Sequence, residues 1–148
     1  MVSCKRIVFI AVLAFTSAVF GVEKAGENMK GLVAGYIDIQ EALASDNLGQ
    51  AKAKASDLLR SKAELNQKQF TGLKSELTGL SEAPSLQKAR DRFKKISPAF
   101  VEWLKANKDD SLEILYCPMA GAKWVQKKGD VKNPYYGSEM LRCGERSS

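Results

Sequence analysis

Four sulfur-bearing side chains lie close together in the last third of the sequence, and their types suit soft-metal or thiol chemistry. Cys117 and Met119 are separated by one residue, and Met140 and Cys143 by two. In an extended strand, residues two apart share a face, so the first pair would point the same way if the extended run continues to Met119. A single helical turn would place the second pair on one side. The segment thus offers two pairs of soft ligands that folding can bring together.

These residues support two different sites. Thiolates and thioethers select Cu(I), so Cys117, Met119, Met140 and Cys143 are candidate ligands of a Cu(I) site. Alternatively, Cys117 and Cys143 form a disulfide, which would stabilise the chain by roughly 3 kcal/mol. The two sites can be different redox states of one protein. The methionines taken alone more often fill a core than bind a metal.

The composition excludes most familiar enzyme sites. The sequence has no histidine, the usual general base and a common metal ligand. We find no phosphate-binding glycine loop, nucleophile elbow or C-x-x-C motif. Asp109 and Asp110 lie in a turn among lysines, which indicates solvated carboxylates. We therefore expect a protein that is not an enzyme.

The net charge of +6 comes with no basic patch interleaved with aromatic residues, so we expect no nucleic-acid partner. Basic residues outnumber acidic ones near the cysteines. These positive side chains predict a solvent-exposed charged face, or an electrostatic field at the cysteines that favours the thiolate over the thiol. These residues are Lys123, Lys127, Lys128, Lys132, Arg142 and Arg146.

The N-terminus has the pattern of a secretory signal peptide. A short basic stretch precedes an apolar run from Ile7 to Phe20, which is shorter than the about 20 residues of a membrane-spanning helix. We expect cleavage after Gly21, hence a signal peptide over 1–21 and a periplasmic or secreted protein with no membrane span. An uncleaved anchor is the alternative. Export would place the cysteines in an oxidising compartment.

Residues 22–148 then form a single domain that begins with helices. Apolar residues three and four apart predict helices over 27–44 and 48–59, separated by a capping cluster at Ser45 to Asn47. A break is expected over 64–69. Two further helices are predicted over 70–80 and, with Ser85 as cap, from 86 to 107. Pro98 lies inside the last pattern and is expected to kink or restart that helix.

After residue 107 the spacing of the apolar residues changes from every third or fourth position, typical of a helix, to every second position, typical of a strand. Residues 112–116 read as one strand, and residues 123–126, around Trp124, as a second that pairs through a turn at 118–121. The predicted fold is mainly α: an antiparallel bundle of three to four helices with a small turn-rich C-terminal β-hairpin cap. We call residues 112–144, which hold the sulfurs, the C-terminal lobe.

The sequence of this lobe resembles a bacterial exported family of unknown function. The resemblance rests on Tyr116-Cys117-Pro118-Met119-Ala120, Trp124, Asn133-Pro134-Tyr135-Tyr136-Gly137, Met140 and Cys143-Gly144. In that family a helical bundle precedes a CPMA…W…NPYYG…M…CG tail. The domain also occurs attached to periplasmic adaptor subunits of copper and silver efflux pumps. Many members carry a histidine near the first cysteine, where this chain has Tyr116. This departure counts against a histidine-assisted metal site, whereas a sulfur-only Cu(I) or Ag(I) site is compatible with it.

These observations lead to two hypotheses. The first is an exported protein that binds Cu(I) or Ag(I) for metal tolerance or delivery, with an efflux or envelope protein as partner. The second is a structural or protein-interaction module that holds a permanent disulfide and no metal.

Overall fold

A computed structural model describes residues 19–61 and 70–147, with side chains described from Met29 onward. Four helices are present, α1 (Val19–Ala44), α2 (Leu48–Arg60), α3 (Leu73–Ser81) and α4 (Leu86–Asn107). They are followed by β1 (Leu112–Cys117), β2 (Ala122–Lys127), the short 3-10 helix η2 (Gly137–Glu139) and β3 (Glu145–Ser147). The predicted break over 64–69 and most of the predicted signal peptide lie outside the described residues.

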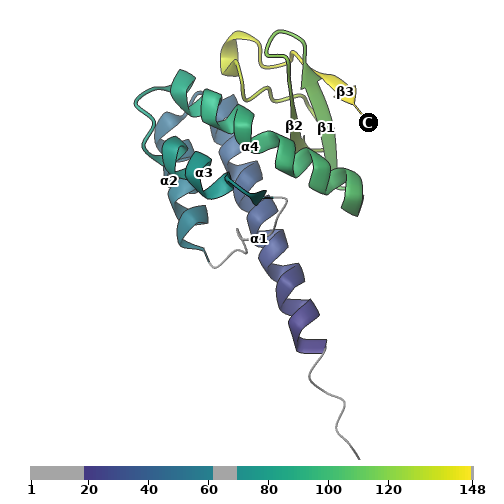
Figure 1. Ribbon diagram of the computed structural model, residues 1–148. Helices are drawn as coiled ribbons and strands as arrows, with labels where there is room; N and C mark the ends of the chain where they lie inside the picture. The colour runs from purple at the N-terminus through teal and green to yellow at the C-terminus, as the bar shows by residue number, and fades with distance from the viewer. Residues whose placement is uncertain (1–18, 62–69, 148) are drawn as a thin grey trace, which may run out of the picture.

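The helices form because local signals and apolar spacing agree. Asn47 caps α2 by accepting from the backbone N–H of Gln50, and Ser85 caps α4 by accepting from Lys88. Each helix packs against its sequence neighbour, α1 on α2, α2 on α3 and α3 on α4. α4 also contacts α1 and lies against the sheet (Figure 1). The prediction of a mainly α fold is confirmed.

One of the two outcomes expected at Pro98, a restart of the helix, was wrong. α4 runs from Leu86 to Asn107 as one helix. Ser97, the residue before the proline, donates its hydroxyl to the Phe93 carbonyl inside this helix. Packing of the buried α4 face outweighs the hydrogen bond that proline cannot make.

The C-terminal cap is a three-stranded antiparallel sheet rather than the predicted hairpin. The strand order is β2-β1-β3, so the short β3 pairs with the side of β1 opposite to β2. In this register Leu115 faces Trp124 across β1 and β2. Because alternate residues share a face, Leu115, Cys117 and Trp124 lie on the same side of the sheet.

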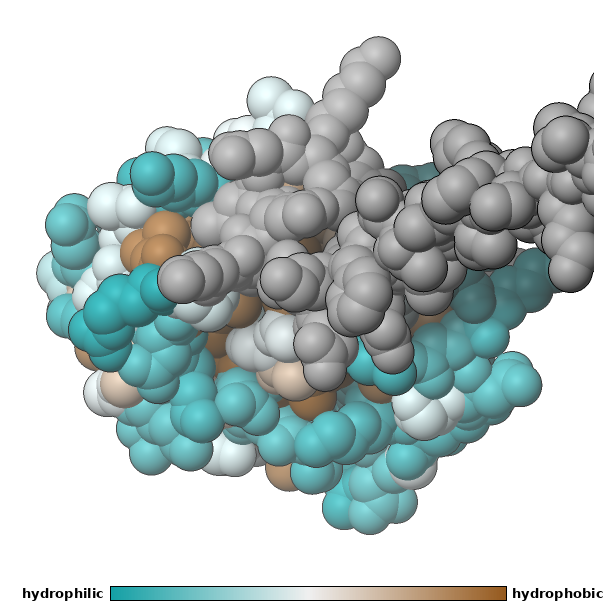
Figure 2. Space-filling view, turned by 90° about the horizontal axis from the view of Figure 1, so that it is seen from below, coloured by the Kyte–Doolittle hydropathy of each residue, from teal (hydrophilic) through white to brown (hydrophobic). Residues whose placement is uncertain are grey.

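Among the described residues, no helix combines the length and apolar character needed to cross a membrane. Viewed from below (Figure 2), the described surface is mostly hydrophilic, and apolar residues show at a few places. The apolar side chains gather inside, where one cluster joins the helices to the sheet.

Two tyrosines connect this core to the free edge of β2. Tyr36 on α1 is fully buried and stacks on Phe93 and Phe100 of α4, with ring centroids 5.0 and 4.0 Å away. Its hydroxyl accepts from the Val125 N–H at 3.1 Å and lies 3.1 Å from Ser97 Oγ. Tyr135 donates to the Lys123 carbonyl at 2.6 Å. Two backbone groups of this edge, the Val125 N–H and the Lys123 carbonyl, are therefore satisfied by side chains instead of a further strand.

We predict that Tyr36→Phe lowers the free energy of unfolding by about 1–3 kcal/mol, because it leaves the buried Val125 N–H without an acceptor. Urea denaturation followed by circular dichroism measures this loss. The control Tyr116→Phe, at a partly exposed position of β1, should change stability by less than about 0.5 kcal/mol. Equal stability of Tyr36→Phe and wild type would contradict the assigned hydrogen bond.

Candidate functional site

Cys117 is the last residue of β1 and is completely buried. The chain turns directly after it, and the turn is closed by a 2.8 Å hydrogen bond from the Gly121 N–H to the Cys117 carbonyl. The Ala120 N–H donates to Cys117 Sγ at 3.4 Å. Lys94 of α4 holds the same turn by donating to the Ala120 carbonyl. These contacts hold the turn, and with it the sulfur, in place at the end of β1.

The segment after β2, residues 128–144, covers the face of the sheet that carries Cys117; we call it the C-terminal tail. Its Lys132 N–H donates to the side-chain oxygen of Gln126 at 3.0 Å. Gly144 lies so close to Trp124 that a Cβ built on it would stand 2.5 Å from the indole. This close approach sets the position of the neighbouring Cys143, which is partly exposed.

Cys117 and Cys143 are free thiols, and one side-chain amide, that of Asn133, contacts both residues. We call the two cysteines the thiol pair. Desolvation, followed by the nearby Cys117, raises the pKa of Cys143 above its ordinary value. Since this shift opposes thiolate formation, the basic residues of the lobe do not dominate the electrostatics at Cys143.

Asn133 links the two members of the thiol pair, a role that the sequence did not suggest. It is fully buried, and its Nδ2 donates to Cys117 Sγ at 3.3 Å and to the Cys143 carbonyl at 2.7 Å. Its Oδ1 accepts from the Tyr135 N–H at 2.8 Å. The only signal in the sequence is the Asn133-Pro134 dipeptide, which we interpreted as a turn.

Met119 does not share the strand face of Cys117. The extended run of β1 ends at Cys117, so Met119 lies in the turn predicted over 118–121, and it is 64% exposed. The condition for a shared face, an extended run that continues to Met119, is therefore not met. Met140 is partly buried, and its carbonyl accepts from the Cys143 N–H at 2.9 Å, which closes a turn between the two residues.

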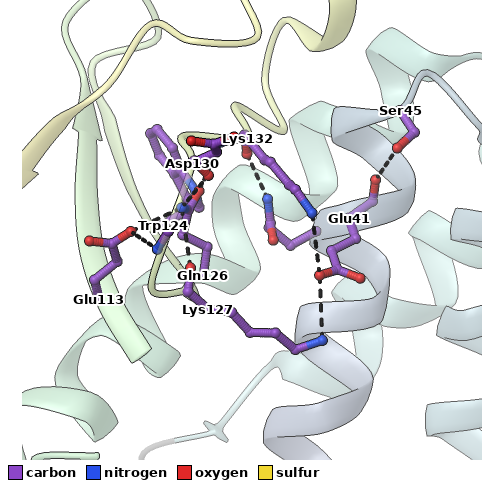
Figure 3. Close-up of polar contacts among 10 residues, drawn as sticks. Glu41, Ser45, Glu113, Trp124, Gln126, Lys127, Asp130 and Lys132 are labelled. Carbon is purple, nitrogen blue, oxygen red and sulfur yellow. Dashed lines mark hydrogen bonds and ion pairs between the residues drawn. The ribbon is translucent and has the colours of Figure 1, made fainter. Parts of the chain in front are cut away.

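Basic residues of the lobe are mostly engaged with carboxylates. Lys127 and Lys132 approach Glu41 Oε1 at 3.4 and 3.9 Å (Figure 3). Arg142 pairs with Asp130 at 3.0 Å, and Arg146 with Glu113 at 2.8 Å. These cations tie the lobe to α1 and to itself at the surface.

Figure 3 also shows a second buried amide, Gln126, in the same lobe. Its Oε1 accepts from the Trp124 indole at 3.2 Å, and its Nε2 donates to Glu113 and to the Asp130 carbonyl at 3.1 and 3.0 Å. None of the recorded contacts of Gln126 involves a cysteine. Its hydrogen-bond partners therefore differ from those of Asn133, although both amides are buried.

An arginine and an aspartate attach the C-terminal tail to the helices. Arg90 of α4 donates to the carbonyls of Leu43 and Pro134 and to the carboxylate of Asp46. Asp46 also accepts from the Ser138 N–H at 3.0 Å. The tail approaches closely here because it has Gly137 at φ +56, where any Cβ would collide with the Asp46 carboxylate.

The fold and site define a small, mainly helical domain with a C-terminal sheet that holds two adjacent thiols. Residues 32–111, just over half of the chain, match the family model described as "Protein of unknown function (DUF3347)". The chain belongs to this family. No curated protein and no solved structure matches. The matched region ends one residue before β1, so the sheet and the thiol pair lie beyond it.

Within the described residues, no group of three or more Cys, Asp or Glu side chains is placed to hold a metal ion. A metal ion on the thiol pair would have the two thiolates as its ligands. Two thiolates satisfy a soft ion such as Cu(I), whereas Zn²⁺ requires four ligands. The donor set fits a soft monovalent ion.

We predict that Asp46→Asn lowers the free energy of unfolding by about 1–3 kcal/mol at neutral pH, because it removes the charged partner of Arg90. Asn tolerates the positive φ of 57° at this position, so the backbone is retained. Urea unfolding curves give the value. The control Asp57→Asn breaks only the exposed pair with Arg60 and should cost less than about 0.5 kcal/mol.

The stability difference between wild type and Asp46→Asn is expected to depend on pH. Hydrogen bonds from Ser138, and then Arg90, hold the pKa of Asp46 below its ordinary value. A lowered pKa contributes stability above the unfolded pKa of about 3.9, and this is lost as pH falls through the folded pKa. The stability difference between wild type and Asp46→Asn should therefore shrink below about pH 4. A constant difference would contradict the assigned ion pair.

We predict that Cys117→Ser makes Cys143 more reactive in the reduced protein. Removal of the neighbouring thiol lowers the pKa of Cys143 toward its ordinary value, so more thiolate is present at a given pH. The pH profile of iodoacetamide alkylation at Cys143, followed by mass spectrometry, should move to lower pH. The third cysteine of the sequence, Cys4, is replaced by Ser in both proteins so that it does not react with the reagent. An unchanged pH profile of alkylation would show that Cys117 does not affect the pKa of Cys143.

Proposed function

We propose that this protein binds a soft monovalent metal ion, Cu(I) or Ag(I), through Cys117 and Cys143. The observation that carries the proposal is that one buried amide contacts both cysteines: Asn133 Nδ2 donates to Cys117 Sγ at 3.3 Å and to the Cys143 carbonyl at 2.7 Å. Soft thiolates select Cu(I) over harder ions. Two N–H groups, from Ala120 and Asn133, point at Cys117 Sγ, where they would stabilise the negative charge of a metal-bound sulfur.

The access route to the pair supports binding of a small ion. Cys117 is completely buried, while Cys143 is partly exposed. An incoming ion would meet Cys143 first and then be shared with Cys117. Met119, exposed on the turn that follows Cys117, and Met140, one turn before Cys143, are the thioethers nearest to the two cysteines in the sequence and the candidate additional ligands.

The biological role that we propose is metal tolerance or delivery outside the cytoplasm. The signal-peptide pattern over 1–21 supports export to the periplasm or beyond. The C-terminal lobe resembles tails of exported domains that also occur on periplasmic adaptor subunits of copper and silver efflux pumps. We therefore propose an efflux or envelope protein as the partner that supplies or receives the ion.

A second candidate function rests on the same observation. In an oxidising compartment, Cys117 and Cys143 would lose two protons and two electrons to a disulfide oxidant and form a bond between their sulfurs. The loop so closed has about 27 residues, and the bond would add roughly 3 kcal/mol. The protein would then be a structural or interaction module that binds no metal.

Cu(I) titration of the reduced chain carrying Cys4→Ser, against a competing chelator, tests the metal proposal. We expect a single ion per chain and at least a tenfold loss of affinity in Cys117→Ser and in Cys143→Ser, since each removes one of two thiolate ligands. Met119→Ala and Met140→Ala, measured separately, identify a thioether ligand. Binding no stronger than that of the Cys117→Ser/Cys143→Ser protein would rule the proposal out.

Thiol counting on protein isolated from the exporting compartment separates the two functions. The metal proposal predicts free thiols, or thiols released on metal removal. The alternative, a structural or interaction module, predicts a Cys117–Cys143 disulfide that resists mild reductant. Its melting temperature should fall when strong reductant is added.

A further inference from the structure

The carboxamide of Asn133 is bound on every side by groups whose hydrogen-bonding character fixes its orientation. The Tyr135 N–H can only donate, so the atom that it contacts at 2.8 Å must be the amide oxygen. The amide nitrogen therefore faces the thiol pair. Its two hydrogens are both used, one on Cys117 Sγ and one on the Cys143 carbonyl.

This arrangement couples two residues that are distant in the sequence. Cys117 ends a strand, whereas Cys143 lies in the C-terminal tail, and Asn133 contacts both from one rigid, fully buried side chain. The contact to the Cys143 carbonyl sets where the second cysteine stands. The contact to Cys117 Sγ places a donor on the sulfur that is farther from solvent.

We infer that Asn133 is the positioning residue of the thiol pair: its amide holds both cysteines at the separation needed to share one soft ion, and its N–H stabilises the sulfur of Cys117 in the bound state. This inference rests on the proposed metal function and assigns to Asn133 a contribution beyond stabilising the lobe. Loss of such a supporting contact typically weakens metal binding by 10–100-fold.

Asn133→Asp is the sharpest test, because it keeps the shape and the acceptor for the Tyr135 N–H but replaces the NH₂ donor with a carboxylate oxygen. That oxygen would repel both the sulfur of Cys117 and the Cys143 carbonyl. We expect Cu(I) affinity at neutral pH to fall 10–100-fold relative to wild type in the chelator competition, with Cys4→Ser in every protein.

Gln126→Glu is the matched control, since it makes the same amide-to-acid change at an equally buried residue of the same lobe. It places a carboxylate against Glu113, so it should destabilise the lobe at least as much. Per folded molecule, its Cu(I) affinity should stay within about threefold of wild type. A loss in Gln126→Glu equal to that in Asn133→Asp would overturn the inference, because lobe stability alone would then explain both.

The pH dependence of Asn133→Asp gives a readout that a purely structural role would not produce. Protonation of the introduced carboxyl restores an O–H donor, so the affinity difference from wild type should narrow as pH falls. The titratable and charged groups near this carboxyl are Cys117 on β1, Cys143 and Tyr135 in the tail, Glu145 on β3 and Arg90 on α4. An affinity difference that stays constant with pH would contradict the donor role.

A metal-free measurement keeps this inference separate from the proposed function. In reduced wild type, buried Cys117 should be alkylated by iodoacetamide far more slowly than Cys143. Asn133→Asp should remove most of this protection, and Gln126→Glu should retain it. If wild type binds no Cu(I) but this pattern holds, the metal function fails while Asn133 still positions the pair.

If Asn133→Asp does not fold, Asn133→Ser takes its place, because a hydroxyl can donate only one of the two hydrogen bonds. An intermediate loss of Cu(I) affinity and of Cys117 protection is then expected. Wild-type affinity and protection in Asn133→Ser would overturn the inference.

Discussion

The attachment of Arg90 to three oxygens from different parts of the chain is the interaction on which the site depends. Its guanidinium joins α4 to the end of α1, to the α1–α2 turn and to Pro134 in the C-terminal tail. Such a planar group with several donors can satisfy acceptors from several directions at once. Because Asn133 immediately precedes the anchored proline, the position of the thiol pair is set by a contact made on the helices.

Much of the fold was predictable because its determinants are local. Helix caps at Asn47 and Ser85, and apolar residues at helical spacing, are properties of a few consecutive residues. The strand β3 was missed for the opposite reason. Its three residues, Glu145 to Ser147, have no apolar alternation, and they are extended because the free side of β1 provides hydrogen-bonding partners. Because this pairing is with a strand far away in the sequence, a segment of three residues carries no local sequence pattern that predicts it.

The candidate site likewise contains residues that the sequence alone could identify and residues that it could not. The residue types Cys117 and Cys143 indicate thiol chemistry in any context, so the sequence identified them. Asn133 has the local signature of a turn residue, and its contacts with the thiol pair arise only when the tail folds back on the sheet. Met119 does not share the face of Cys117 because a turn closed by Gly121 interrupts the strand, and alternation of side chains cannot be extended through a turn.

The family match and the site lie in different parts of the chain. The match spans most of the helices and ends before β1, yet the helices and the sheet share one core through Tyr36, Phe93 and Trp124. The helical part therefore serves as the platform on which the sheet is built. The membership by itself carries no function to the C-terminal lobe, whose role depends on its own residues.

The tyrosine hydroxyls on the outer side of β2 have a consequence for how this protein meets others of its kind. An uncovered strand side invites a foreign strand to add on, which leads to aggregation. Here the Val125 amide and the Lys123 carbonyl already have intramolecular partners beneath packed aromatic rings. The opposite side ends in a strand of only three residues that carries a glutamate and an arginine. Addition of a strand from a neighbouring chain is thereby discouraged at both edges of the sheet.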